Sequence, residues 1–395
     1  MNSVIAPKGF LFSTAEAAIK KPGRKDLALI YSEKEAVVSG MFTMNNIKAA
    51  PVKLDMKRIK SGKGQAIIVN SGNANACTGG QGMKDALEMT ALTAKTLGLK
   101  QGDVYVCSTG VIGTPMPMER IQPKITELAG NLGKAGIDDV AAAIMTTDTF
   151  QKAISKKIKI NGTAVTISAV CKGAGMICPN MATMLCFIMT DANIDRKALD
   201  TALKNAANKS FNRITIDGDM STNDTVLIMA NGLACNKPIK TNSKDFEIFA
   251  KALSGMTYEL SKMIVTDGEG ATKLIEIEVK NAKNDNDAEK AAFAVANSML
   301  VKTAIYGNDA NWGRIMAALG YSGISIKEEK TDIFLNRLKM VSKGMGTGKD
   351  KEANERLKSK EVKIVVALGL GKGAAKVLTC DLTEDYVKIN AEYRT

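Results

Sequence analysis

Short apolar runs alternate with amphipathic stretches along most of the chain. Runs with the length of buried strands lie at 26–31, 66–69, 103–107, 185–189 and 225–230. Stretches with helical periodicity or helix-forming composition lie at 83–97, 138–145, 197–209 and 246–262. Strand and helix signals that alternate in this way predict an α/β fold built in layers.

The clearest local signal is a pair of alternating segments joined by a two-residue connection. Asn161-Gly162 separates the segment 158–160 from the segment 165–167. Asn-Gly favours the tight turn whose twist matches that of paired antiparallel strands. The pattern therefore predicts a β-hairpin.

Two polar segments that follow predicted strands are expected to be loops. Residues 70–75 read Asn-Ser-Gly-Asn-Ala-Asn, and residues 108–110 read Ser-Thr-Gly. Small, polar, turn-forming residues of this kind are typical of the ends of strands.

The C-terminal part of the chain follows a polar, turn-rich stretch at 282–287. This stretch predicts a linker, with a helix over 288–300 beyond it. We therefore expect residues 183–282 to complete the main domain and residues 288–395 to form a smaller C-terminal domain.

The formal net charge of +13 raises the prospect of an anionic partner. The lysines are scattered, however, and acidic residues usually lie among them. Aromatic residues, which could stack on bases, make up only 5% of the chain. We therefore expect no nucleic-acid partner. A basic nucleic-acid-binding protein is the alternative, and a salt titration of binding would reveal it.

The sequence shows neither a signal peptide nor an apolar run of about 18 residues, so we expect a cytoplasmic protein without a membrane partner. The seven cysteines are odd in number and lack C-x-x-C spacing. They indicate reduced thiols rather than disulfides or a zinc site. Two glycine-rich segments, 344–349 and 369–373, lack the spacing of nucleotide sites and predict turns.

The chain contains no histidine. This absence excludes Ser-His-Asp and Cys-His catalytic pairs, histidine metal sites and histidine general bases. Any acid–base chemistry must therefore use a carboxylate, a lysine, a thiol or a chain amine.

Residues 172–186 contain the most informative arrangement. Two glycines, a proline and an asparagine interrupt regular structure before Ala182-Thr183, and a buried strand is expected to begin at Thr183. Scission before Thr183 would leave a threonine whose own α-amine, with a pKa of about 7.7 to 8, can accept the proton of its hydroxyl. One residue would then supply nucleophile and base. From the pattern alone, a structural threonine that opens a strand is the commoner alternative.

The run KGAGMICPNMATML, residues 172–185, closely resembles the signature of the ornithine acetyltransferase family of arginine biosynthesis. Further blocks similar to that family occur in the family's order. They lie at 70–79, 107–113, 145–149, 211–219, 221–225, 265–272, 307–314 and 389–395. The resemblance covers essentially the whole chain.

The resemblance implies a layered α/β sandwich of the N-terminal-nucleophile aminopeptidase/ornithine acetyltransferase type, with a smaller C-terminal α/β unit. It also implies self-cleavage between Ala182 and Thr183, by attack of the Thr183 hydroxyl on the Ala182 carbonyl. The products would be an α chain, 1–182, and a β chain, 183–395. Two copies of each would form a tetramer.

The implied reaction transfers acetyl from N2-acetylornithine to glutamate through an acetyl-threonine at Thr183. Oxyanion stabilisation maps to Thr109 and Gly110. Substrate contacts map to Thr146, Lys172, Thr183, Glu269, Asn390 and Thr395. No metal or cofactor is implied. Acetyl-CoA is a second acetyl donor in some members of the family, and no local motif separates these members from the others.

The implied substrate contacts have physically suitable tasks. Lys172 can pair with the α-carboxylate that both substrates carry, and Glu269 can face the terminal ammonium of ornithine. Thr147 is the alternative to Thr146 if the register slips by one residue. Cys178 stands where the family commonly has histidine. Two further alternatives are a related N-terminal-nucleophile aminopeptidase and an uncleaved structural protein with an inactive site.

Overall fold

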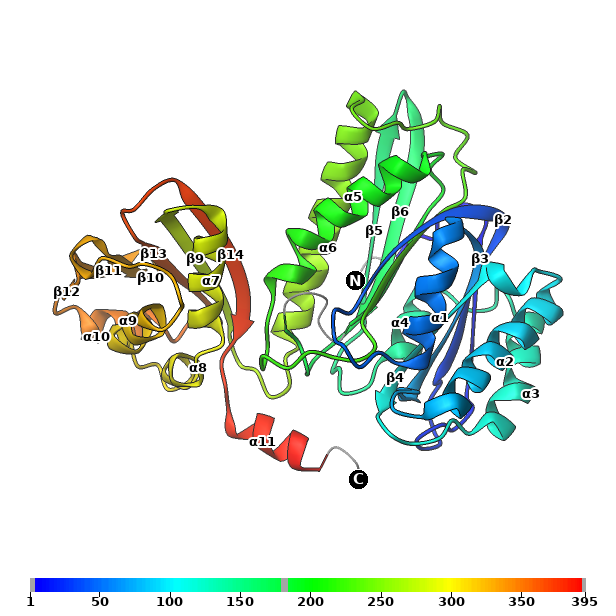
Figure 1. The fold of residues 1–395 in the computed structure, drawn as a ribbon, viewed down its shortest axis with the longest axis horizontal. Coiled ribbons are helices and arrows are strands. Elements are labelled where there is room, and N and C mark those ends of the chain that lie inside the picture. Colours follow the sequence, from blue (N-terminus) through cyan, green and yellow to red (C-terminus); the bar gives the residue numbers. More distant parts are fainter. Residues whose placement is uncertain (1–3, 179–183, 393–395) are drawn as a thin grey trace. The chain divides into compact units, whose positions relative to one another are not determined.

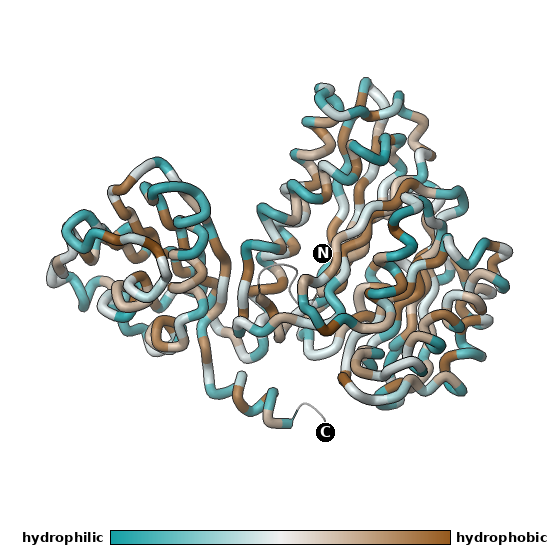
Figure 2. Tube along the Cα trace, in the orientation of Figure 1, coloured by the Kyte–Doolittle hydropathy of each residue, from teal (hydrophilic) through white to brown (hydrophobic). Residues whose placement is uncertain are grey.

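The computed structural model describes residues 4–178 and 184–392 (Figure 1). The chain divides into two compact units. The first spans Met1–Gly173, Asn180–Asn212 and Met220–Leu260, and the second spans Ala174–Pro179, Arg213–Asp219 and Ser261–Thr395. Each unit has a sheet and an apolar core of its own, and Figure 2 shows hydrophobic positions gathered along the strands of both.

Among the described residues, the first unit is built on an eight-stranded mixed sheet. Its strands are β1 (Phe10–Ala15), β2 (Leu27–Phe42), β3 (Lys63–Asn73), β4 (Val104–Val111), β5 (Lys152–Ile160), β6 (Thr163–Lys172), β7 (Leu185–Thr190) and β8 (Thr225–Ala230). Their order is β4-β3-β2-β8-β7-β6-β5, with β1 paired to β2. The pairs β3–β4 and β7–β8 are parallel. The predicted strands at 26–31, 66–69, 185–189 and 225–230 are thereby confirmed.

Helices cover both faces of this sheet. They are α1 (Ala50–Arg58), α2 (Gly79–Leu97), α3 (Met118–Gly130), α4 (Ile137–Ile144), α5 (Arg196–Asn208) and α6 (Lys244–Thr266), which continues into residues of the second unit. Alternate side chains of β2 pack into two different cores. Ala28 and Ile30 pack in one cluster with α4, whereas Leu27 and Leu29 pack in another with α2 and α3. This alternation produces the predicted layers.

The predicted hairpin is confirmed. β5 and β6 pair antiparallel, with Ile160 opposite Thr163. The connecting residues Asn161 and Gly162 both have positive φ, 48° and 81°. A type I′ turn requires that conformation at both positions, and asparagine and glycine adopt it at the lowest cost.

In the described part of the second unit, the sheet has six strands in the order β12-β11-β10-β13-β9-β14. The strands are β9 (Leu274–Ala282), β10 (Asp332–Leu335), β11 (Leu338–Ser342), β12 (Met345–Gly346), β13 (Glu361–Ala367) and β14 (Gly373–Cys380). The helices are α7 (Asp285–Ala296), α8 (Met299–Tyr306), α9 (Trp312–Gly320), α10 (Asp350–Arg356) and α11 (Glu384–Ala391). Across the described residues of both units, short 3-10 segments lie at Ile59–Ser61, Gln101–Asp103, Phe211–Arg213 and Glu328–Lys330.

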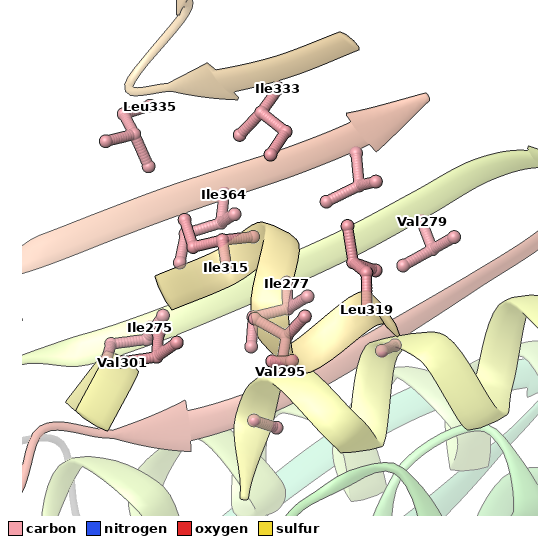
Figure 3. Packing of buried hydrophobic residues seen from close by; sticks show 14 of the residues in the cluster. Ile275, Ile277, Val279, Val295, Val301, Ile315, Leu319, Ile333, Leu335 and Ile364 are labelled. Carbon is pink, nitrogen blue, oxygen red and sulfur yellow. The ribbon is translucent and has the colours of Figure 1, made fainter. Parts of the chain in front are cut away.

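The core of the second unit lies between its sheet and the helices α7 and α9 (Figure 3). Ile275, Ile277 and Val279 alternate along β9 and are buried, and they share a cluster with Val295 of α7 and Leu319 of α9. Burial of each such side chain stabilises the fold by about 1.5–3 kcal/mol. The residues at 274–279 are therefore the strand that their alternation predicts.

The two segments predicted as loops after strands are instead largely strand. β3 continues to Asn73, and β4 includes all of residues 108–110. The parallel ladder places Asn70 opposite Ser108 and Ser71 opposite Thr109. Ladder hydrogen bonds between neighbouring strands thus override the turn preference of these small residues.

The stretch at 282–287 is a helix cap inside the second unit rather than a linker. β9 ends at Ala282, and the Asn284 side chain caps α7 by accepting the N–H of Asp287. The helix predicted over 288–300 is two helices, because Ser298 caps a new one by accepting the N–H of Val301.

The expected start of a strand at Thr183 lies outside the described residues. Met184 is described and precedes β7 without belonging to it, and β7 begins at Leu185. The apolar segment that follows the Ala182-Thr183 pair is therefore a fully buried strand, as predicted for residues 185–189.

Candidate active site

Thr109 and Gly110 lie near the end of β4, where the backbones of β3 and β4 approach closely. Gly110 has a φ of 137°, and a Cβ there would lie 2.2 Å from the carbonyl carbon of Gly72. A side chain at position 110 would therefore collide with the neighbouring backbone. Thr109, beside it, is buried. The close approach restricts the conformations of both residues.

Buried polar side chains hold this strand end. Ser108 Oγ donates a hydrogen bond to Asn70 Oδ1 at 2.6 Å. Asn223 Nδ2 donates to the carbonyl oxygens of Ser108 and Ala74 at 2.7 and 2.6 Å. A buried network whose members are satisfied rigidifies its surroundings. Asn223, which precedes β8, thus fixes the backbone next to Thr109.

Lys172, the last residue of β6, directs its ammonium group at Thr109. Its Nζ donates to Thr109 Oγ1 at 3.4 Å, and both residues are buried. β4 and β6 are not neighbours in the sheet, so tertiary structure creates this contact. A hydroxyl oxygen that accepts from an ammonium keeps its own proton for another acceptor. The pair can therefore present a hydrogen-bond donor and a cation together.

Asp148 links several groups around the end of β6. Its Oδ1 accepts from Lys152 Nζ and from the N–H of Gly173, both at 2.7 Å. Its Oδ2 accepts from the N–H of Thr146 at 3.0 Å. Burial raises the pKa of this carboxyl, but the ammonium groups of Lys172 and Lys152 outweigh burial and lower the pKa to about 2. Asp148 is therefore charged at neutral pH.

Asp224 is a second buried acid in the first unit. Its Oδ1 accepts from the N–H of Met184 at 3.1 Å. Its Oδ2 is buried and has no hydrogen-bond partner among the described residues. Burial raises the pKa of this carboxyl well above its usual range and so favours the neutral form. The residue it binds, Met184, directly follows Thr183 in the sequence.

In the second unit, Glu269 lies against Ala174 and Gly175. Its N–H donates to the Ala174 carbonyl at 2.8 Å, and its Oε2 accepts from Asn390 Nδ2 at 2.8 Å. A Cβ on Gly175 would lie 2.4 Å from the Glu269 carboxyl carbon. The glycine thus leaves room for the carboxylate against the backbone. Glu269 and Asn390, predicted as substrate contacts, are brought together by α11.

Asp217 anchors the same segment and α11. Its two oxygens accept the N–H groups of Met176 and Ile177 at 2.6 and 2.9 Å. Tyr386 of α11 donates its hydroxyl to Asp217 Oδ2 at 3.2 Å. Burial raises the pKa of the Asp217 carboxyl, and it also raises that of the Tyr386 phenol, with Asp217 adding to the second effect. Asp217 therefore holds the backbone that directly follows Ala174 and Gly175, the two residues that Glu269 contacts.

Residues 11–395 match the family model of the ArgJ family. The protein of Geobacter sulfurreducens described as arginine biosynthesis bifunctional protein ArgJ is 54% identical over 390 residues, which are 98% of this chain and 99% of that protein. The chain belongs to the ArgJ family. It is therefore an acyltransferase of arginine biosynthesis, and its fold is of the α/β class.

Two solved structures are also similar to this ArgJ family member. The arginine biosynthesis bifunctional protein argJ of Bacillus halodurans is 50% identical, with a TM-score of 0.51, over 52% of this chain and 97% of that chain. The ornithine acetyltransferase of Mycobacterium tuberculosis complexed with ornithine is 34% identical, with a TM-score of 0.40, over 45% of this chain and 94% of that chain.

The predicted site residues of this family member divide between the two units. The first unit holds Thr109, Gly110, Thr146 and Lys172, and it brings Lys172 to Thr109. Thr146 is linked to them through Asp148. The second unit holds Glu269 and Asn390 in contact. The predicted scissile pair, Ala182 and Thr183, and the C-terminal Thr395 lie outside the described residues.

Sequence reasoning did not single out Asp148, Lys152, Asp217 or Asp224. The three acids lie in the blocks 145–149, 211–219 and 221–225. Only the resemblance to the family drew attention to these blocks. A signal was present in each block, because an acid lies among small, turn-forming residues. Lys152 opens a strand that holds three further lysines, Lys156, Lys157 and Lys159, and nothing local distinguishes it from these exposed residues.

Among residues 4–178 and 184–392, no group of three or more acidic or cysteine side chains is arranged to hold a metal ion. Across the same residues, every helix is too short or too polar to span a membrane.

Proposed function

We propose that the enzyme transfers an acetyl group from N2-acetylornithine to glutamate, with Thr183 as the nucleophile. The observation that carries this proposal is the buried pair of Lys172 and Thr109, a cation and a hydroxyl donor in one place, in a chain of the ArgJ family that has no histidine. The names of the similar proteins place those proteins in arginine biosynthesis.

Thr183 becomes an N-terminal residue by self-cleavage. Its Oγ attacks the Ala182 carbonyl, the Thr183 nitrogen leaves as an amine after taking up a proton, and water hydrolyses the resulting ester. The fragments are 1–182 and 183–395. The Bacillus halodurans chain supports such scission, because 52% of this chain matches 97% of that one, so that chain is about half as long.

The new α-amine serves as the base for acetyl transfer. With a pKa of about 7.7 to 8, it takes the proton from Thr183 Oγ as the oxygen attacks the acetyl carbonyl. Ornithine leaves with that proton on its α-nitrogen, and the acetyl group remains as an ester. The α-amine of glutamate then attacks the ester, and Thr183 Oγ recovers a proton.

Thr109 and Gly110 stabilise the oxyanion of each tetrahedral intermediate. Thr109 Oγ1 accepts from Lys172, so its own proton is available to the developing negative charge. Preorganised donors of this kind contribute about 10²–10³-fold to the rate. The close packing of Gly110 against Gly72 limits the movement of the second donor, the main-chain N–H.

The two ends of the substrate differ in charge. Lys172 pairs with the α-carboxylate common to N-acetylornithine and glutamate. Glu269 faces the terminal ammonium of the ornithine moiety, and Asn390 supplies a neutral donor beside it for the side-chain carboxylate of glutamate. Thr146 and the C-terminal Thr395 complete the contacts. The enzyme acts in the cytoplasm as a tetramer of two α and two β chains.

The decisive experiment compares the wild-type protein with Thr183→Ala on a denaturing gel and in an assay with acetyl-labelled N-acetylornithine. We expect two fragments and labelled N-acetylglutamate from the wild type, and one 42.0 kDa band without transfer from the variant. Thr201→Ala, at a half-buried position of α5, is the matched control and should resemble the wild type.

The proposal is wrong if Thr183→Ala is still cut into the same fragments and transfers acetyl at the wild-type rate. Release of acetate without labelled N-acetylglutamate would instead identify a hydrolase of the aminopeptidase type. Replacing N-acetylornithine by acetyl-CoA in the same assay tests the second acetyl donor.

A further inference from the structure

Asn223, which lies just before β8, holds the strand that carries the proposed oxyanion donors. Its Nδ2 donates to the carbonyls of Ser108 and Ala74 at 2.7 and 2.6 Å. Its Oδ1 accepts from Thr222 Oγ1 at 2.6 Å, so both ends of the amide are engaged and its orientation is fixed. Asn223 therefore holds the main chain that leads directly into Thr109.

Asp224, the next residue, holds the peptide group that directly follows the proposed nucleophile. Its Oδ1 accepts the N–H of Met184 at 3.1 Å, and the N–H of Thr225 donates to the Met184 carbonyl at 3.1 Å. Met184 is thus bound on both sides by the residues at the start of β8. The Met184 nitrogen is bonded to the carbonyl carbon of Thr183, so the contact with Asp224 restricts the peptide group that these two residues share.

The strands β4 and β7, which these two side chains reach or closely precede, are not neighbours in the sheet. β3, β2 and β8 lie between them, so ladder hydrogen bonds relate β4 to β7 only through three intervening strands, each of which can twist by a different amount. Asn223 and Asp224 instead connect the two strand ends through a single peptide unit. Both are buried, with 5% and 0% of their surface exposed, and hydrogen bonds in such places are stronger than in water.

We propose that Asn223 and Asp224 are positioning residues that set the distance between the Thr183 nucleophile and the oxyanion donors Thr109 and Gly110. The proposal rests on the proposed acetyl transfer. It assigns the two side chains neither a proton transfer nor a contact with the substrate. Their effect is on the geometry of attack, where a displacement of about 1 Å can lower a rate about 100-fold.

Asp224 needs only an acceptor oxygen for this task. Burial raises the pKa of its carboxyl well above its usual range, which favours the neutral acid, and an asparagine amide has the same shape and keeps a carbonyl oxygen. Asp224→Asn should therefore keep most of the wild-type rate. Asp224→Leu, of similar size but without an acceptor, should be about 10- to 100-fold slower. An equal loss in the two variants would show that Asp224 acts through its charge or its proton, and would overturn the proposal.

The measured quantity is the rate at which fragment 183–395 gains an acetyl group from saturating N-acetylornithine. Intact-protein mass spectrometry follows this half-reaction, and the rate is expressed per mole of cleaved chain. Asn223→Ala removes both donated hydrogen bonds and should also be about 10- to 100-fold slower. KM for N-acetylornithine should change little in these variants, because neither side chain binds the substrate. A raised KM with an unchanged maximal rate would contradict a positioning role.

A double-mutant cycle separates one shared geometry from two local effects. The two side chains act in series, so breaking either connection should release the same constraint. The double variant of Asn223→Ala with Asp224→Leu should then be little slower than the slower single variant. Independent effects would instead multiply, and a multiplied loss would overturn the proposal.

Asn231→Ala and Asp191→Leu are the matched controls, because they change the same residue types at the opposite ends of β8 and β7. Asn231 Nδ2 donates to the Lys8 carbonyl at 2.9 Å, and Asp191 Oδ1 accepts the N–H of Thr166 at 2.8 Å. Both residues are buried, so their loss should destabilise the protein in urea denaturation. The acetylation rate per cleaved chain should stay that of the wild type. An equal fall in the controls would point to general damage and contradict the proposal.

Self-cleavage provides a second readout, because the Thr183 hydroxyl attacks in that step too. Asp224→Leu should be cut more slowly than Asp191→Leu on a denaturing gel, and equal cleavage and acetylation rates would overturn the proposal. Asp224→Ala carries the same expectation if Asp224→Leu does not fold. A wild type that is cut but gains no acetyl group would refute the acetyl transfer, while the cleavage rates would still test the positioning of Thr183.

Discussion

Asp148 in the first unit and Asp217 in the second have similar structural tasks in opposite electrostatic settings. Each accepts main-chain N–H groups of the segment 173–177: Asp148 from Gly173, and Asp217 from Met176 and Ile177. Yet the pKa of Asp148 is lowered to about 2, whereas that of Asp217 is raised above its usual value.

The difference shows which interaction decides the charge of a buried acid. Burial raises the pKa of both carboxyls, and main-chain hydrogen bonds lower the pKa of both. Asp148 also interacts with the ammonium groups of Lys172 and Lys152, while the charged neighbour of Asp217 is the like-charged Asp219. Nearby cations, rather than hydrogen bonds alone, therefore keep a buried carboxylate ionised.

The largest effect should come from removing one cation from Asp148. Lys152→Met leaves a buried carboxylate with less compensation, and breaking such pairs typically costs about 3–5 kcal/mol. Because Lys172 still compensates part of the charge, we expect a loss of about 3 kcal/mol in the free energy of unfolding at pH 7, measured by urea denaturation. Lys156→Met, an exposed lysine of the same strand, should change it little. Equal stability of the two variants would contradict the comparison.

Asp148→Asn should have an intermediate effect, on the loss of stability in acid. The folded pKa of Asp148 is about 2 and the ordinary value is 3.8, so its ionisation contributes about 2 kcal/mol that is present above pH 4 and lost as the pH falls toward 2. We expect the wild type to lose about 1 kcal/mol more than Asp148→Asn between pH 5 and pH 3.

For Asp217→Asn, we expect the opposite sign in the difference of acid stability from the wild type. Because the folded pKa of Asp217 is raised, protonation favours the folded protein as the pH falls. The wild type should therefore lose less stability in acid than Asp217→Asn does. If both variants shift the acid limb of the stability profile in the same direction, the contrast between the two carboxylates is wrong.

The smallest effect concerns the contact between α11 and Asp217. Tyr386→Phe removes one hydroxyl donor from Asp217, and a single hydrogen bond contributes about 1 kcal/mol. We expect amide hydrogen exchange in residues 384–391 to become about fivefold faster. Tyr321→Phe, at an exposed tyrosine of the second unit, is the control and should leave those rates unchanged.

Much of the fold could be predicted because its signals are local. The hairpin around Asn161-Gly162, the strand at 225–230 and the helix at 197–209 each depend on the residues within them. The segments 70–75 and 108–110 were predicted as loops because their composition favours turns. They are strands largely because each pairs with the other, and that pairing joins residues far apart in the sequence.

The candidate site was predictable to a similar extent. Each of Thr109, Lys172 and Glu269 lies in a block of sequence that resembles the family, so each could be predicted individually. The blocks say nothing of the contact between Lys172 and Thr109, which spans 63 residues of sequence. Lys152 gave no signal, because the same strand holds three other lysines and burial alone separates Lys152 from them.

By itself, the sequence determined the alternation of strands and helices, the chemical types available for catalysis and, through the lack of histidine, the need for another base. These follow from side-chain shape and acidity, which each residue carries with it. Only the tertiary structure decided which lysine is buried against a carboxylate, which acid is ionised and which hydroxyl meets an ammonium. Those properties depend on desolvation and on distances between charges, and both arise only when separate strands pack together.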